Sequence, residues 1–327
     1  SLVGSEMCIR DRAIAERQDA VDDSLFAQEF DVEKQWDFGI EVIKALGFDF
    51  EHGRQDKTAH PFTTSFSPSD VRLTTRLSPD QFKMALFASI HESGHGMYEQ
   101  GFDRSFDRTP LGDSASLGVH ESQSRMWENI VGRSRGFWTH WLPRLKGYFP
   151  RQLEGVGVEA FYQAINRVEP SLIRVEADEV TYNLHIMVRF EIENLMVEGK
   201  VKVADLPELW DAKMDEYLGI RPPDVAAGVL QDVHWSSGYI GYFPTYSLGN
   251  LLSAQFYSQA VSEAPGIPAQ IEQGEFGALF DWMREKIHKP GCMYTPAELV
   301  ERVTGGPIRT EPFLDYIRAK YSDIYGL

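Results

Sequence analysis

Two histidines and a glutamate in one short segment have the types and spacing to support metal chemistry. His91 and His95 are four residues apart in the segment His91-Glu92-Ser93-Gly94-His95. On a helix, this spacing places both imidazoles on one face, where they can share a metal ion. Glu92 is placed to take a proton from a water molecule that the ion activates. The pattern is typical of zinc-dependent enzymes that hydrolyse peptide bonds.

The surrounding residues predict the helix that this motif needs. We expect Ser78 to be the N-cap, Pro79 the first helical residue and Gln81 the third residue after the cap. An apolar stripe at three- and four-residue spacings follows, formed by Phe82, Leu86, Phe87 and Ile90. Gly101 lies where a C-terminal cap glycine is expected. The motif should therefore lie inside a helix between Ser78 and Gly101.

A zinc site of this kind needs a third protein ligand and keeps its fourth position for water. Glu99 is on the same helical face as His91, but eight residues of helix separate the two by about 12 Å. The pattern with three histidines would need a histidine six residues after His95, and the chain has Gly101 there. The third ligand must therefore come from a second segment.

The segment of residues 118–128 offers two candidates for that ligand, His120 and Glu121, and spacing alone leaves both open. Together with the first motif, this segment resembles the carboxypeptidase Taq family of zinc metallocarboxypeptidases. Six blocks, in order between residues 60 and 235, carry the resemblance. They are His60-Pro61-Phe62, Asp70-Val71-Arg72-Leu73-Thr74, His91-Glu92-Ser93-Gly94-His95, His120-Glu121-Ser122-Gln123, Ile173-Arg174-Val175-Glu176-Ala177-Asp178 and Gly228-Val229-Leu230-Gln231-Asp232-Val233-His234-Trp235.

The resemblance implies a site of two histidines and one glutamate, with Zn²⁺ held by His91, His95 and Glu121. His120 would then support the site or the fold rather than bind the metal. Co²⁺ or Mn²⁺ could occupy the same ligands, because metal selection depends partly on availability. The resemblance also implies a homodimer and a large helical zinc-metallopeptidase fold of the gluzincin, neurolysin-like type.

Hydrophobic periodicity independently predicts a mainly helical chain with a small β element. One predicted helical face consists of Trp36, Ile40, Ile43 and Leu46 before Gly47, and another of Leu184, Met187, Val188, Ile192 and Leu195 before Gly199. Further helices are predicted near residues 205–218, 247–263, 273–288 and 310–325. Residues 62–66 and 71–75 predict a β-hairpin beside the metal site. Its edge could accept an extended peptide as an added strand, or the hairpin could be scaffold only.

Peptide hydrolysis also needs a donor for the developing oxyanion. The candidates are His234, which Asp232 could orient, and Tyr242 in a segment rich in glycine and aromatic residues. We expect most of the other aromatic residues there to be core packing; these are Trp235, Tyr239, Phe243 and Tyr246.

Recognition of a free C-terminal carboxylate calls for an arginine with two parallel donors. Arg174 is the preferred candidate and Arg72 the second, since both lie in blocks that match family motifs thought to line the substrate site. A structural ion pair is the alternative for each, with Glu176 or Asp178 beside Arg174 and with Asp70 beside Arg72.

Two further residues have open roles. His60 either contacts substrate or fixes the hairpin. Glu128, two helical turns beyond Glu121, either supports a metal ligand or is a solvated or ion-paired glutamate.

Composition and charge fit a soluble enzyme. The chain has 49 acidic and 32 basic residues, a formal net charge of −17, which disfavours binding to nucleic acid or to anionic membranes. Its apolar runs are far shorter than the roughly 20 residues of a membrane span. The two cysteines, Cys8 and Cys292, form no disulfide framework, so we expect a cytoplasmic protein without an export signal.

Residues 1–12 carry no periodic pattern, and we expect a non-native or disordered leader there. Residues 13–327 are then expected to form a single helical catalytic domain, the C-terminal part of the family fold in an N-terminally shortened member. Three functions remain open: a metallocarboxypeptidase of broad specificity, a metallo-endopeptidase or oligopeptidase with the same zinc site, and an inactive truncated fragment that only binds zinc.

Overall fold

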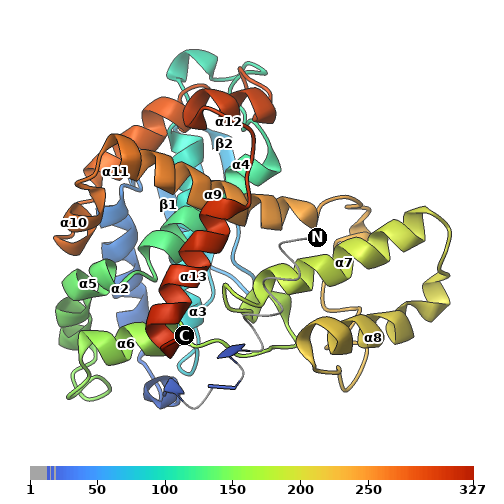
Figure 1. The fold of residues 1–327 in the computed structure, drawn as a ribbon. Helices are drawn as coiled ribbons and strands as arrows, with labels where there is room; N and C mark the ends of the chain where they lie inside the picture. Colours follow the sequence, from blue (N-terminus) through green and yellow to red (C-terminus); the bar gives the residue numbers. More distant parts are fainter. Residues whose placement is uncertain (1–12, 15, 18–19) are drawn as a thin grey trace. The chain divides into compact units, whose positions relative to one another are not determined.

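The computed structural model describes residues 13–14, 16–17 and 20–327 and is mainly helical with one small sheet, as predicted (Figure 1). The predicted leader, residues 1–12, lies outside the described residues. The chain divides into two compact units. The larger unit comprises residues 22–165 and 249–313, and the smaller unit comprises residues 166–248 and 314–327 with the described residues before Asp22. The expectation of a single catalytic domain over residues 13–327 stays a prediction.

The larger unit contains most of the helices and the whole sheet (Figure 1). Its helices are α2 (Val32–Leu46), α3 (Phe82–Gln100), α4 (Leu117–Arg125), α5 (Arg135–Tyr148), α6 (Val158–Ile165), α10 (Ile267–Glu272), α11 (Gly277–Met283) and α12 (Pro296–Thr304). Short π-helical segments, Met126–Val131 and Arg284–His288, directly follow α4 and α11. Helices α9 (Pro244–Glu263) and α13 (Glu311–Tyr325) contribute residues to both units.

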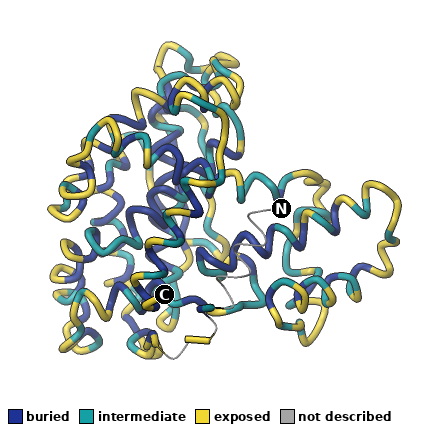
Figure 2. The backbone as a smooth tube through the Cα atoms, in the orientation of Figure 1, coloured by how far each residue is buried: buried dark blue, intermediate teal, exposed yellow. Residues whose placement is uncertain are grey.

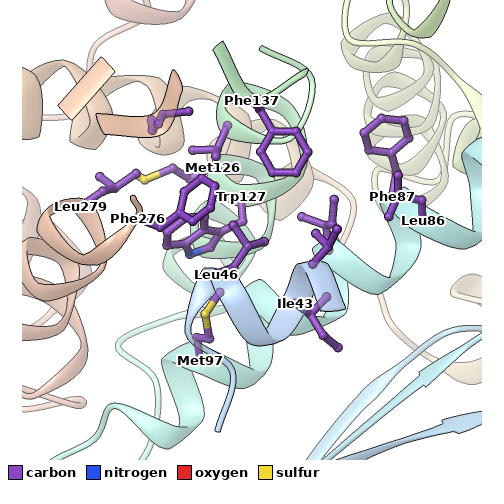
Figure 3. Close-up of a cluster of buried hydrophobic side chains, with 14 of the residues drawn as sticks. Ile43, Leu46, Leu86, Phe87, Met97, Met126, Trp127, Phe137, Phe276 and Leu279 are labelled. Carbon is purple, nitrogen blue, oxygen red and sulfur yellow. The ribbon is translucent and has the colours of Figure 1, made fainter. Parts of the chain in front are cut away.

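Helix α2 forms as the sequence predicts. The side chain of Asp31 accepts hydrogen bonds from the first free N–H groups, and Gly47 ends the helix at a φ of 119°, a left-handed conformation that favours glycine. The buried face includes Ile43 and Leu46 together with Phe38, which the periodic pattern had not included. Figure 3 shows Ile43 and Leu46 in the hydrophobic cluster of this unit, which also contains buried side chains of α3, α5 and α11.

The helix that carries the histidine motif, α3, starts later than expected. It begins at Phe82, so the predicted N-cap at Ser78 was wrong: the Ser78 hydroxyl bonds to the carboxylate of Asp80 instead of to a helix N–H. The helix ends at Gly101 as predicted, but in a right-handed conformation. A glycine is required there because a Cβ atom at residue 101 would lie 2.5 Å from the Cβ of His288.

The predicted hairpin is confirmed as β2 (Thr63–Ser67) paired antiparallel with β3 (Asp70–Thr75). A third strand, β1 (Gly53–Lys57), pairs parallel with β3, so the strand order is β1-β3-β2. The sequence pattern missed β1 because its residues are polar and lack the usual alternation of apolar and polar residues. Strand β2 is therefore an edge strand, and α3 packs on this sheet.

The smaller unit is built around α7 (Tyr182–Val197) and α8 (Leu206–Leu218), which pack against each other. The helices predicted near residues 205–218, 247–263 and 310–325 are confirmed. The one predicted near 273–288 begins only at Gly277 and changes to a π-helix at Arg284. No helix among the described residues is both long and apolar enough to cross a membrane.

Candidate metal centre

Close packing of α3 against α4 places the two predicted motifs face to face. A Cβ atom at Gly94, inside the histidine motif, would lie 2.6 Å from the Cα of Ser124, so only glycine permits this approach. Gly249 on α9 has the same role on another side, since a Cβ there would lie 2.4 Å from the Cγ of Glu121. Helix α3 is largely buried (Figure 2). The site is therefore held by tightly packed helices within the larger unit.

The three predicted ligands lie together. One ligand atom each of His91, His95 and Glu121 falls within 4.8 Å of the others. The Nε2 atoms of His91 and His95 are 3.5 Å and 3.3 Å from Glu121 Oε2. Tetrahedral zinc holds nitrogen and oxygen ligands at about 2.0–2.2 Å, which separates them by about 3.4 Å. Two imidazoles and one carboxylate at this spacing fit a divalent ion such as zinc.

Glu128 supports His91 from outside the ligand set. The Nδ1 of His91 is 2.7 Å from Glu128 Oε2, so the proton lies on Nδ1 and Nε2 keeps its lone pair for a metal. Burial alone would raise the pKa of Glu128, but the charge of Arg125, the bond from His91 and the charge of Arg133 lower it to about 2. Of the two roles left open for Glu128, the geometry favours support of a ligand.

Glu121 is kept ionised by its neighbours. Arg125, one helical turn later, donates from Nε to Glu121 Oε1 at 2.7 Å, and Ser124 Oγ donates to Oε2 at 3.0 Å. Burial raises the pKa of this carboxyl, but the charge of Arg125 and the interactions with His91 and His95 bring it well below its usual value. Arg125 was not among the predicted site residues, although its spacing of four residues from Glu121 on a helix was a signal for this ion pair.

The carboxylate of Glu92 is buried and bonded to the edge strand. Thr63 Oγ1 on β2 lies 2.6 Å from Glu92 Oε2 and 3.0 Å from the Glu92 carbonyl oxygen. Burial raises the pKa of Glu92, while the charge of His91 and the bond from Thr63 act in the opposite direction. A carboxylate with a raised pKa beside the ligands suits a general base. The hairpin does lie beside the motif, and Thr63 is a contact that no sequence pattern indicated.

His120 lies next to the ligand set rather than in it. Its Nδ1 is 2.5 Å from His95 Nδ1, and its Nε2 is 2.8 Å from Glu99 Oε1. This placement agrees with a supporting role for His120.

Within the smaller unit, Arg174 forms a buried ion pair. Its Nη2 donates to Asp232 Oδ1 at 2.7 Å, and its Nη1 donates to the hydroxyl of Tyr182 at 2.9 Å. Arg189 binds the other oxygen of Asp232 at 2.7 Å. The expected partners beside Arg174, Glu176 and Asp178, were wrong. The nearest opposite charge in sequence does not pair with Arg174, because the fold brings Asp232 to its guanidinium.

Glu176 is exposed, and Asp178 instead accepts bonds from the backbone of Val180 and Thr181. Asp178 therefore caps the turn before α7, and the ion-pair partner of Arg174 is Asp232.

The aromatic segment of the smaller unit surrounds His234. The Nε2 of His234 lies 3.0 Å from the hydroxyl of Tyr246, and its ring packs against Phe243 and Tyr242. Asp232 Oδ1 is 3.7 Å from His234 Nδ1, which is too long for a hydrogen bond, so the expected orienting bond from Asp232 is not formed.

Of the aromatic residues expected to be core packing, Phe243 is buried and Trp235 and Tyr246 pack beside it. Tyr239 is the exception, since 58% of its surface is exposed. Tyr242 is partly buried.

The remaining substrate candidates lie at the sheet. Arg72 is exposed and makes two parallel bonds to Asp70, at 2.8 Å and 2.9 Å, as the ion-pair alternative expected. His60 is exposed just before β2, and its carbonyl accepts a bond from Thr58 Oγ1 at 2.8 Å. Neither contact assigns a role in substrate binding.

Two imidazoles, a carboxylate on a second helix and a buried glutamate inside the first motif form a candidate metal site of the kind that metallopeptidases use. Comparison with known proteins leads to the same class. The family model described as carboxypeptidase Taq (M32) metallopeptidase matches residues 7–321, so the chain belongs to this family.

The similar proteins that the comparison found are named as carboxypeptidases. The chain is 50% identical over 305 residues to thermostable carboxypeptidase 1 of Thermus thermophilus, covering 93% of this chain and 60% of that protein. It is 42% identical to carboxypeptidase 1 of Bacillus subtilis, covering 93% and 61%. The crystal structure of an M32 carboxypeptidase from Deinococcus radiodurans matches with a TM-score of 0.94 at 45% identity, covering 99% of this chain and 67% of that one. The chain spans about 60% of the length of the two curated relatives.

Proposed function

We propose that this chain is the metal-binding part of a metallocarboxypeptidase that removes single residues from peptide C-termini with broad specificity. The observation that carries the proposal is the convergence of His91, His95 and Glu121 beside the buried carboxylate of Glu92. Family membership and relatives named carboxypeptidase support the same activity. Zn²⁺ is the proposed ion, with Co²⁺ or Mn²⁺ as substitutes, because imidazole and carboxylate ligands suit all three.

The protein groups around the proposed ion have separable tasks. When bound, such an ion lowers the pKa of a water molecule and polarises the scissile carbonyl. His91 and His95 present Nε2 lone pairs, and Glu121 contributes a carboxylate that Arg125 keeps ionised. Glu92 accepts the proton of the attacking water on its carboxylate and passes it to the leaving amine. Thr63 holds that carboxylate in place through its 2.6 Å hydrogen bond.

The chain offers three candidates for holding substrate groups, Arg174, Arg72 and His60. Arg174 is the preferred clamp for the C-terminal carboxylate: Arg174 and Arg189 share one carboxylate, Asp232, so these three side chains carry an excess of positive charge. Arg72 and His60 are the second candidates.

The proposed donors to the oxyanion are His234 and Tyr242. Both carry a polar hydrogen-bonding group on an aromatic ring, and their rings pack together with centroids 5.2 Å apart. We also propose a cytoplasmic homodimer that binds neither nucleic acid nor membranes, which the family resemblance and the net charge of −17 support.

A panel of matched peptides tests this function. Zinc-loaded wild-type protein and Glu92→Gln are incubated with peptides that have free or amidated C-termini, and the products are identified by mass spectrometry. We expect metal-dependent release of single residues from the free peptides only. Glu92→Gln should keep its zinc and lose at least about 100-fold in rate, since a positioned general base contributes roughly that much.

Two results would contradict the proposal. Equal cleavage of amidated peptides would favour the endopeptidase or oligopeptidase alternative. Zinc binding without any turnover by the wild-type chain would favour the fragment that only binds zinc.

A further inference from the structure

Glu99, which is too far along α3 to be a metal ligand, is nevertheless connected to the ligand set. Its Oε1 lies 2.8 Å from the Nε2 of His120, and the Nδ1 of His120 lies 2.5 Å from the Nδ1 of His95. All three side chains are largely buried, with between 15% and 18% of each side chain exposed. The three residues, called here the Glu99 relay, form a continuous hydrogen-bonded chain that ends at a proposed ligand.

The chemistry of the groups sets the direction of this chain. As a carboxylate, Glu99 can only accept a hydrogen bond, so His120 must carry its proton on Nε2. A neutral imidazole that is protonated on one nitrogen accepts on the other, so His120 Nδ1 accepts the proton of His95 Nδ1. The Nε2 of His95 is then unprotonated on the side that lies 3.3 Å from Glu121. The carboxylate of Glu99, which can only accept, therefore sets the direction of both hydrogen bonds.

His91, the other proposed histidine ligand, is fixed as the same tautomer by a direct contact with a carboxylate. His91 Nδ1 is 2.7 Å from Glu128 Oε2, which is also paired with Arg125. A carboxylate that bonds directly to a ligand imidazole fixes its tautomer and its ring orientation. Within the described part of the chain, the hydrogen bond at the Nδ1 of His95 is to another imidazole, that of His120, and not to a carboxylate. Without Glu99, nothing in the relay would decide which of the two rings donates.

We propose that Glu99 and His120 are positioning residues that fix His95 as the tautomer protonated on Nδ1, with its Nε2 lone pair presented to the metal ion. This inference rests on the metal centre of the proposed function. It gives His120, which immediately precedes the ligand Glu121, a defined task. It also gives Glu99 a task eight residues from His91, at a distance that excludes direct ligation.

The test is a double-mutant cycle on the full chain, with zinc affinity as the measurement. Zn²⁺ dissociation constants are determined by competition with a chromophoric chelator, and the visible spectrum of bound Co²⁺ reports the geometry of the site. The variants are Glu99→Gln, His120→Asn and the double variant. An amide at residue 99 can donate as well as accept, so it no longer fixes the direction of the chain. An asparagine at residue 120 places a carbonyl oxygen near the former Nδ1, where it accepts from His95 without reference to Glu99.

We expect Glu99→Gln to weaken zinc binding about tenfold, the lower end of the effect of removing outer hydrogen-bond partners of a metal ligand. In the His120→Asn background, the same substitution should have no further effect. The matched control is Glu51→Gln, which removes an exposed carboxylate of the same unit that is not part of the relay. The control should bind zinc like the wild type.

Three results would overturn the proposal: an unchanged affinity in Glu99→Gln, an equal loss in both backgrounds, or the same loss in Glu51→Gln. An equal loss in both backgrounds is also what a general loss of folding would produce, so the cycle separates positioning from structure. A wild-type chain that binds no zinc would contradict the proposed function itself and remove the basis of the relay. That failure is distinct, because it is visible before any variant is compared.

Discussion

At the level of single residues, each proposed ligand has a second protein contact that fixes its state. Glu128 bonds to His91, His120 bonds to His95, and Arg125 bonds to Glu121. Such outer contacts orient ligands and tune their basicity, so they belong to the metal site as much as the ligands do. The proposed base, Glu92, is held in the same way from the edge strand.

The bond from Thr63 to Glu92 gives a prediction at this scale. Thr63→Val keeps the shape of the side chain and removes the hydroxyl that donates to the carboxylate. Hydrogen bonds to charged groups contribute about 1.5–3 kcal/mol, so we expect kcat to fall by about tenfold or more. Zinc content, measured by elemental analysis, should not change, because the hydroxyl of Thr63 bonds to Glu92 and Glu92 is not a proposed ligand. Thr64→Val, on the other face of β2, is the control, and an unchanged kcat in Thr63→Val would contradict the assigned role.

At the level of elements, the sequence predicted helices better than the contacts between them. The spacing of His91 and His95 placed both correctly on one helical face, since that follows from helix geometry alone. The start of α3 was wrong because Ser78 has a competing partner, Asp80, in the preceding turn. Thr63 and Glu99 were not predicted as site residues, because their partners come from other segments and no local pattern reports those contacts.

The approach of α3 to α4 gives the prediction at this scale. Gly94→Ala would place a Cβ 2.6 Å from the Cα of Ser124, a backbone atom that cannot move alone. We expect the helices to separate, with a loss of about 1–3 kcal/mol in the free energy of unfolding and weaker zinc binding. Gly147→Ala is the control, because a Cβ there meets no atom within 4 Å. Urea unfolding and zinc titration check both variants, and equal behaviour of the two would contradict the packing argument.

At the level of the whole molecule, the two units arrange their buried charges differently. The larger unit buries carboxylates at and beside the proposed metal ligands, whereas the smaller unit buries two arginines against Asp232 and a lysine, Lys320, against Glu179. A buried pair of this kind is costly to break, because it leaves an uncompensated charge behind. The Arg174–Asp232–Arg189 cluster should therefore control how the smaller unit responds to acid.

The pH dependence of this cluster can be given a sign. Burial raises the pKa of Asp232, but the charges of Arg189 and Arg174 and a hydrogen bond from Arg174 outweigh burial and lower it to about 2. The stabilisation is therefore complete above the unfolded pKa of about 3.9 and is lost as the pH falls through about 2, amounting to about 2 kcal/mol. Urea unfolding at pH 5 and pH 2.5 should show this loss in the wild type and a smaller loss in Asp232→Asn. Equal losses in the wild type and in Asp232→Asn would contradict the assignment of this pH dependence to Asp232.

The central claim is that one divalent ion binds between His91, His95 and Glu121, and anomalous diffraction at the zinc absorption edge from zinc-loaded crystals tests it most directly. The account predicts one strong peak per chain at about 2.0–2.2 Å from His91 Nε2, His95 Nε2 and a carboxylate oxygen of Glu121. A peak bound instead by His120 or Glu99, or no peak at α3, would contradict it.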